Sequence, residues 1–130
     1  MPVLAARCKV MAFHGFQPTD HLQRFYAAAH LHVVSSRHEA SGVTVLEAAS
    51  TGLPTVGTAV GFISDWRESG AVAVPVGDSN ALAASTIDLL QNPERRARVA
   101  AAARAWTLAH DADWSTSAFE DLYARTAGAS

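Results

Sequence analysis

Two glutamates eight positions apart, Glu39 and Glu47, are the residues whose type and spacing best suit chemistry in this sequence. Glu39 falls in the polar stretch 35–42, and Glu47 falls in the apolar-periodic stretch that follows it. Ionised carboxylates accept hydrogen bonds from vicinal hydroxyl groups, so each glutamate is suited to hold a sugar ring. A carboxylate repels phosphate, so neither glutamate is placed to bind a phosphate group directly.

Between the two glutamates, Ser41 and Gly42 mark the start of a predicted helix. A helix start offers unpaired backbone N–H groups and the positive end of the helix dipole, which together favour an anion. Phosphate at this helix end, a ribose at Glu47 and a second sugar at Glu39 would together describe a sugar nucleotide. The plainer alternative is that Glu39 is a solvated loop residue and that Glu47 is a first-turn carboxylate favoured by the dipole.

The elements that must position these residues alternate between strands and helices. Apolar periodicity and Gly and Pro punctuation predict strands at 9–13, 31–34, 54–56 and 72–76, and helices at 19–30, 43–50 and 62–68. Three further helices are predicted at 80–90, 93–110 and 115–126. The first of the six predicted helices is expected to be capped by Thr19 or Asp20.

This alternation predicts an α/β fold with a Rossmann-like parallel sheet of about four strands, flanking helices and a C-terminal helical tail. We expect a single domain over 1–130, with its α/β part at about 9–77 and its tail at about 78–127. Ligands of such sheets bind at the carboxyl ends of the strands, where the stretch 35–42 is expected to lie.

Composition excludes several classes of protein. The chain has 130 residues, 49% of them hydrophobic, and its 10 basic and 12 acidic side chains provide no positive field for nucleic acid. No apolar stretch approaches the ~20 residues of a membrane span, and no signal-peptide layout is present. The single Cys8 cannot form an internal disulfide, and no Cys and His spacing predicts a metal site. A cytoplasmic protein without a transmembrane segment is therefore predicted.

Residues 37–48, which contain both glutamates, resemble the E-x7-E region of retaining glycosyltransferases of family 4, which typically reads S-R-x-E-G-F-G-x-x-x-L-E-A. Further segments resemble the same family in order and spacing, namely 10–16, 26–37, 52–56, 60–61 and 74–78. The resemblance covers nearly the whole chain from about residue 10. An ordered series of this kind is far more specific than a lone E-x7-E.

The resemblance implies the C-terminal, donor-binding domain of a GT-B enzyme that keeps the anomeric configuration of the sugar. It implies that Glu39 contacts the transferred sugar as the catalytic residue and that Glu47 holds the nucleotide ribose. The donor sugar and diphosphate are implied to contact Ser41, Gly42, Val43, Thr44 and Gly61, and the base is implied to lie near Gly15, Phe16 and Gln17. The partner implied is a nucleotide-diphospho-sugar donor, with no separate cofactor and no metal.

Three positions depart from the family's pattern. Ala40-Ser41 replaces a Gly-Phe pair, Phe62 replaces the second glycine of a Gly-Gly pair, and Ser64-Asp65 replaces Pro-Glu. Phe62 is the most consequential, because glycine is used where the backbone must approach a ligand closely. An aromatic ring there either narrows the diphosphate channel or turns outward.

The family's amino-terminal acceptor domain and the first two βα units of its donor domain have no counterpart in these 130 residues. We therefore expect strand 9–13 to pair directly with 31–35, or the chain to dimerise through exposed sheet edges. The isolated chain is expected to be inactive, because transfer needs a positioned acceptor from that missing domain. The alternative, from another class, is a non-catalytic module that binds a nucleotide or another protein.

Overall fold

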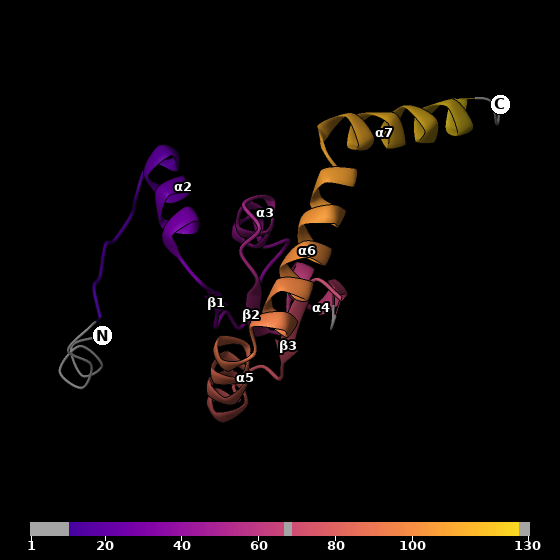
Figure 1. Ribbon diagram of the computed structural model, residues 1–130. Helices are drawn as coiled ribbons and strands as arrows, with labels where there is room; N and C mark the ends of the chain where they lie inside the picture. The colour runs from indigo at the N-terminus through magenta and orange to yellow at the C-terminus, as the bar shows by residue number, and fades with distance from the viewer. Residues whose placement is uncertain (1–10, 67–68, 128–130) are drawn as a thin grey trace.

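The computed structural model describes residues 11–66 and 69–127, and a parallel sheet lies at its centre (Figure 1). Its three strands, in the spatial order β1-β2-β3, are β1 (His32–Val34), β2 (Thr55–Thr58) and β3 (Ala71–Val74). The helices α3 (Val43–Ser50) and α4 (Gly61–Trp66) form the crossovers between them. The predicted α/β fold with a parallel sheet and flanking helices is confirmed.

The first predicted strand is not found. Lys9 and Val10 lie outside the described residues, and Met11–Phe13 do not form a strand. A strand needs a neighbouring strand for its backbone hydrogen bonds. The described segment before helix 19–28 lies to one side of the sheet and does not run along the edge of β1 (Figure 1). Within the described ranges the sheet therefore ends at β1, and dimerisation through that edge stays a prediction.

The helix α2 (Thr19–Ala28) occurs where the sequence predicts it, but its predicted cap is wrong. Thr19 is already the first helical residue, and no side chain caps the helix. The carbonyl of Pro18 instead accepts hydrogen bonds from the backbone N–H groups of His21 and Leu22, both at 3.0 Å. None of the α2 residues is buried, so the helix has little packing to hold it.

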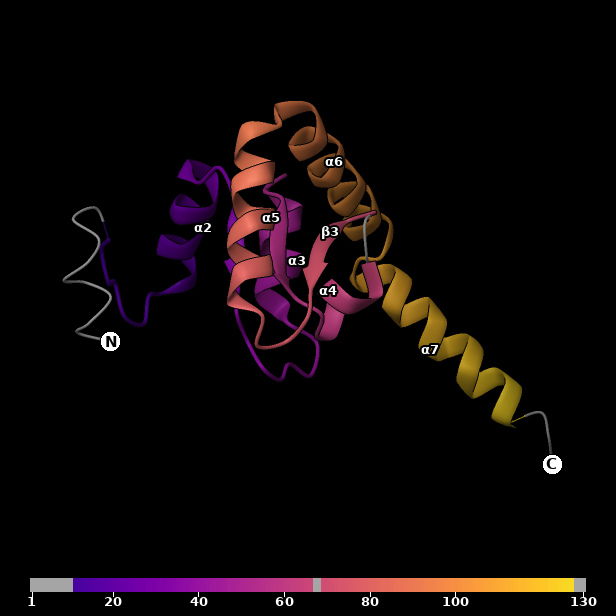
Figure 2. The same cartoon turned by 90° about the horizontal axis from the view of Figure 1, so that it is seen from below.

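The helical tail contains the three predicted helices, α5 (Ser79–Gln91), α6 (Pro93–Ala109) and α7 (Ala112–Ala127). The Asp78 carboxylate accepts a hydrogen bond from the N–H of Ala81 at 2.8 Å, and the Asn92 side chain accepts one from the N–H of Arg95 at 3.0 Å. These caps start α5 and α6 by pairing backbone donors that the first turn leaves free. Two views show α2 and α7 at opposite sides of the molecule, and α7 projects away from the body (Figures 1 and 2).

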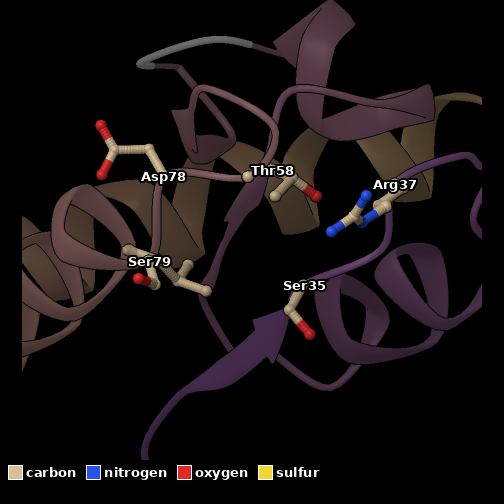
Figure 3. Close-up of a pocket in the computed structure, with 7 residues that line it drawn as sticks. Ser35, Arg37, Thr58, Asp78 and Ser79 are labelled. Atoms are coloured by element: carbon tan, nitrogen blue, oxygen red, sulfur yellow. The ribbon is translucent and has the colours of Figure 1, made fainter.

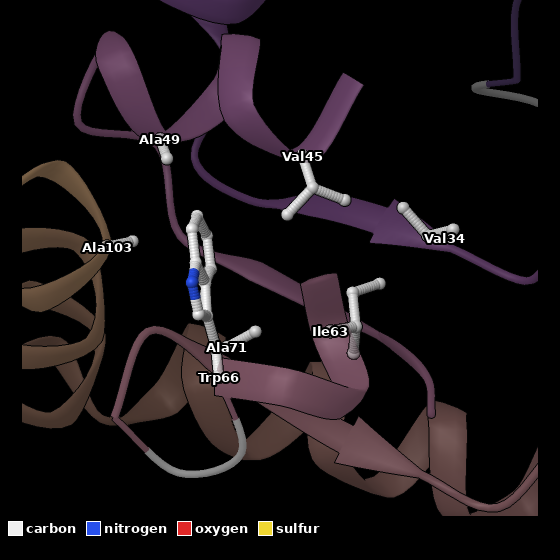
Figure 4. Close-up of a cluster of buried hydrophobic side chains, with 7 residues drawn as sticks. All are labelled: Val34, Val45, Ala49, Ile63, Trp66, Ala71 and Ala103. Carbon is white, nitrogen blue, oxygen red and sulfur yellow. The ribbon is translucent and has the colours of Figure 1, made fainter. Parts of the chain in front are cut away.

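The two faces of the sheet are covered by different elements. On one face, α3, α4 and α6 bury a cluster made of Val34, Val45, Ala49, Ile63, Trp66, Ala71 and Ala103 (Figure 4). On the other face, α5 and α6 enclose a smaller cluster made of Val56, Val72, Leu89 and Val99.

No helix in the described ranges has the length and the apolar character that crossing a bilayer requires.

Gly57 leaves no room for a side chain in the middle of the sheet. It lies in β2 opposite Val34 of β1, and a Cβ added there would sit 2.6 Å from the Val34 carbonyl oxygen. The same Cβ would sit 2.7 Å from Cδ1 of Ile63, a buried side chain of α4. The lack of a side chain at Gly57 therefore allows β1 and α4 to pack against the middle strand.

We expect Gly57→Ala to lower the free energy of unfolding by about 2 kcal/mol, because the methyl group must displace backbone as well as Ile63. Urea unfolding followed by circular dichroism measures the loss. Gly77→Ala is the control, since Gly77 has a φ of +86° but no atom within 4 Å of the added Cβ. A Gly57→Ala variant as stable as the wild type would show that the close approach is unimportant, whereas the loss in Gly77→Ala reports the strain of a side chain at positive φ without crowding.

Candidate functional site

The loop 35–42 leaves the carboxyl end of β1 and is held there by two hydroxyl groups. Thr58 Oγ1, at the end of β2, donates to the carbonyl of Ser36 at 2.5 Å. Ser36 Oγ in turn donates to Oε1 of Glu39 at 2.6 Å. The Glu39 carboxylate is thus oriented at the edge where ligands of parallel sheets bind, although the side chain itself is exposed.

Gly61 lets this loop touch the start of α4. The N–H of Phe62 donates to the Ser41 carbonyl at 3.2 Å, which joins the end of the loop to the helix. At Gly61, where φ is +49°, an added Cβ would lie 2.8 Å from the same carbonyl oxygen and 3.4 Å from Cβ of Glu39. A side chain at this position would therefore push the loop and Glu39 away.

The loop and the start of α4 enclose a hollow of about 430 Å³. Its lining residues are His38, Glu39, Ala40, Ala59, Val60, Gly61, Ser64 and Asp65. The structure thus brings the predicted residues Glu39 and Gly61 together. Two of the departures from the family pattern, Ala40 and Ser64-Asp65, also face this hollow, so they alter its lining rather than a distant surface.

Phe62, the most consequential departure, does not line that hollow. Its ring packs against Trp66 and Trp106, with centroids 5.6 Å away in each pair. The ring is therefore part of the packing between α4 and α6 and leaves the start of α4 accessible. Of the two outcomes considered for Phe62, the structure favours a ring turned away from the loop.

The start of α3 presents backbone rather than side chains. Gly42 occupies the N-cap position with a φ of +78°, and no side chain caps the helix. Val43 and Thr44, the first two helical residues, have exposed side chains. This leaves backbone N–H groups at the carboxyl edge of the sheet, as the anion site predicted at Ser41–Thr44 requires.

Glu47 lies in a different hollow from Glu39. It lines a groove of about 250 Å³ between α2 and α3, with Thr19, Leu22, Gln23, Tyr26, Ser50 and Thr51. The hydroxyl of Tyr26 donates to Oε2 of Glu47 at 2.9 Å. The predicted carboxylate pair is therefore divided between two hollows, each with its own neighbours.

The predicted base-proximal residues Gly15, Phe16 and Gln17 line neither of these two hollows. Phe16 is 96% exposed. Gln17 Nε2 donates to the His14 carbonyl at 2.6 Å, and its Oε1 lies 3.3 Å from Nδ1 of His21. The structure therefore does not bring this segment into contact with Glu39 or the start of α3.

A third cavity, of about 170 Å³, lies between the carboxyl ends of the strands and the start of α5 (Figure 3). Its lining residues are Ser35, Arg37, Thr58, Gly77, Asp78, Ser79 and Leu82. The Arg37 guanidinium points toward Thr58, whereas the Asp78 carboxylate points away (Figure 3).

Sequence reasoning did not assign Arg37 and Tyr26 to a site, although both belong to segments that resemble the family. The signal for Arg37 was its position in the loop that follows a predicted strand.

Burial changes the titration of two groups beside Glu47. Burial, reinforced by the hydrogen bond and the charge of Glu47, raises the pKa of Tyr26 to about 12. Burial lowers the pKa of His32, against the opposing charge of Glu47. His32 Nδ1 lies 3.1 Å from Oγ1 of Thr55, which is buried in β2.

Among the described residues, no three His, Cys, Asp or Glu side chains are grouped closely enough to hold a metal ion.

Comparison with known proteins gives a family match over most of the chain. Residues 7–106 match the family described as "Glycosyl transferases group 1". A 2-deoxystreptamine N-acetyl-D-glucosaminyltransferase of Streptomyces fradiae is 37% identical over 93 residues, which are 70% of this chain and 22% of that protein. A mannosylfructose-phosphate synthase of Agrobacterium fabrum is 46% identical over 48 residues, which are 37% of this chain and 11% of that protein.

Among solved structures, a sucrose-phosphate synthase from Thermosynechococcus elongatus has a similar fold. The match has a TM-score of 0.84 and 26% identity, and it covers 99% of this chain and 34% of that one. The chain thus spans about a tenth to a third of the length of the proteins that it matches.

His32 makes the stability of the fold sensitive to acid. Because burial lowers its pKa in the folded state, the unfolded chain takes up a proton near pH 6.5 that the folded chain resists. The stabilising contribution is complete above that pH and is lost as the pH falls through the lowered pKa of the folded state. We expect urea unfolding to show a larger loss of stability from pH 7.5 to pH 5 in the wild type than in His32→Asn. The control is His30→Asn, at an exposed position, and an equal loss in all three proteins would contradict this account.

Proposed function

The chain belongs to the Glycosyl transferases group 1 family, and on that premise we propose that it is the donor-binding part of a retaining glycosyltransferase. The proposed reaction transfers a sugar from a nucleotide-diphospho-sugar to an acceptor hydroxyl. The relatives named above as a glucosaminyltransferase and two sugar-phosphate synthases support a reaction of this class. We also propose a cytoplasmic location, where the single Cys8 stays reduced.

The anchoring of loop 35–42 is the observation that supports this proposal most directly. Hydrogen bonds from Thr58 and within the loop hold Glu39 beside the uncapped start of α3, at the carboxyl edge of a parallel sheet. Backbone N–H groups suit a diphosphate, and a neighbouring carboxylate suits sugar hydroxyls. The backbone donors proposed for the diphosphate and the carboxylate proposed for the sugar are therefore only a few residues apart in the same loop and helix start.

In the proposed complex, Glu39 orients the transferred sugar and stabilises the positive charge that develops on its ring. This is an electrostatic role, with no covalent bond to the carboxylate. The diphosphate lies at Ser41–Thr44 and against Gly61, and Glu47 accepts hydrogen bonds from the ribose. Gly15, Phe16 and Gln17 lie near the base, which requires the segment before α2 to move toward α3 when the donor binds, while the Tyr26–Glu47 hydrogen bond keeps α2 beside α3.

We propose that these 130 residues by themselves bind a donor without transferring its sugar. An acceptor must be held in line with the reacting carbon and away from water, and such positioning contributes ~7–11 kcal/mol to lowering a barrier. In this proposal an acceptor-binding domain or chain supplies that part. The alternative function, a non-catalytic nucleotide-binding or interaction module, is favoured by one observation, namely that Glu39 and Glu47 line separate hollows.

Isothermal titration of the purified chain with UDP, GDP and ADP tests nucleotide binding and identifies the base. We expect one of the three to bind, and Glu47→Ala to weaken its binding about tenfold, because a hydrogen bond to a charged group is lost. Glu120→Ala is the matched control, since Glu120 is exposed on α7. A folded chain that binds none of the three would contradict the donor-binding proposal and favour an interaction module.

The role of Glu39 is tested separately with the sugar nucleotides of the base that binds. Glu39→Gln is expected to weaken binding of the sugar nucleotide several-fold and to leave the nucleoside diphosphate unaffected, because only the former contains the sugar that Glu39 contacts. Equal weakening of both ligands would indicate that Glu39 acts on the diphosphate or on the shape of the loop. No change in either ligand would place Glu39 outside the site.

A further inference from the structure

Tyr26 connects α2 to the proposed ribose carboxylate. Its hydroxyl donates to Oε2 of Glu47 at 2.9 Å, although the two residues are 21 positions apart in the chain. Both side chains are partly buried, and they line the same groove between α2 and α3. A hydrogen bond to a charged acceptor in such a place is stronger than one in open water.

The ring of Tyr26 makes a second interaction, with His32 of β1. Its ring lies edge-on to the ring of His32, with centroids 6.0 Å apart and an interplanar angle of 88°. His32 is attached to the sheet core, because its Nδ1 lies 3.1 Å from Oγ1 of Thr55, which is 2% exposed. Tyr26 is therefore fixed both by the sheet and by Glu47, and its hydroxyl has a defined direction.

This contact matters because α2 has little else to hold it. No residue of α2 is buried, and the helix lies at one side of the protein, facing α3 across the groove that contains Tyr26 and Glu47 (Figures 1 and 2). The segment Gly15–Gln17, which we propose lies near the base, is separated from α2 by Pro18 alone. The position of α2 relative to α3 therefore sets the distance between that segment and Glu47.

We propose that Tyr26 is a positioning residue for the nucleotide site: its hydroxyl orients the Glu47 carboxylate toward the ribose and attaches α2 to α3. The inference rests on the proposed function, since it assigns a role within the same site. With Oε2 occupied by Tyr26, the lone pairs of Oε1 remain as acceptors for a ribose hydroxyl. Tyr26 acts through Glu47 and does not contact the reacting atoms.

The titration of Tyr26 is consistent with this role. Burial and the adjacent carboxylate raise its pKa to about 12, so the hydroxyl keeps its proton and remains a donor throughout the neutral pH range. The hydrogen bond between them therefore always runs from the Tyr26 hydroxyl to the Glu47 carboxylate near neutral pH.

The test compares two ligands, the nucleoside diphosphate that binds most tightly among UDP, GDP and ADP, and its 2′,3′-dideoxy counterpart. We expect Tyr26→Phe to weaken the ribonucleotide roughly two- to tenfold and to leave the dideoxynucleotide unchanged. We also expect Tyr26→Phe to have no further effect when added to Glu47→Ala. Tyr123→Phe is the matched control, because Tyr123 is 70% exposed on α7.

Three results would overturn the inference while leaving the proposed function intact. Tyr26→Phe would weaken both ligands equally if the residue merely supported the fold. It would leave both unchanged if Glu47 were oriented without it. Its effect would add to that of Glu47→Ala if the two residues acted independently.

If the wild-type chain binds none of the three nucleotides, the proposed function fails and the ribose role of Tyr26 fails with it. The contact itself is then tested by tyrosinate absorbance in a Tyr123→Phe background, where Tyr26 is the remaining tyrosine of the two. We expect Glu47→Gln to lower the pKa of Tyr26 from about 12 toward its ordinary value, because the neighbouring charge is lost. An unchanged titration would overturn the contact as well.

Discussion

The fold depends on the close approach of three elements at Gly57, in the middle of the sheet. The Val34 carbonyl of β1 and the Ile63 side chain of α4 occupy the space that a Cβ would need there. Because glycine leaves this space to them, α4 lies close to the sheet, and the N–H of Phe62 at its start donates to the Ser41 carbonyl at 3.2 Å. Packing within the core therefore determines where the loop 35–42 lies.

The two carboxylates of the proposed site are held in different ways. Glu39 is oriented by hydroxyl groups at the carboxyl edge of the sheet, and its position follows from β1, β2 and α4. Glu47 lies on α3, which packs against the core, but its side chain is held by Tyr26 on the loosely packed α2. A movement of α2 therefore changes the surroundings of Glu47 and leaves those of Glu39 intact.

An aromatic cluster explains how the fold accommodates Phe62 and connects to the tail. Trp66 and Trp106 pack edge-on at 5.2 Å between α4 and α6, and Phe62 contacts both. The ring of His110 stacks on Trp106 at 4.0 Å and also contacts Trp114 of α7. The three tryptophans thus pack helices against one another, and the Phe62 ring packs into the same cluster.

By itself, the sequence determined the parallel α/β class, the order of the elements and the bounds of most helices, because periodicity and caps are local properties of the chain. It also determined that Glu39 follows a strand and that a helix, predicted at 62–68, starts next to Gly61, since both lie in short ordered motifs. Tertiary structure alone decided that Phe62 turns into the core, that Tyr26 reaches Glu47, and that Met11–Phe13 do not join the sheet. Those outcomes depend on which distant surfaces meet, and on whether a strand edge lies within hydrogen-bonding reach, and no local pattern contains that information.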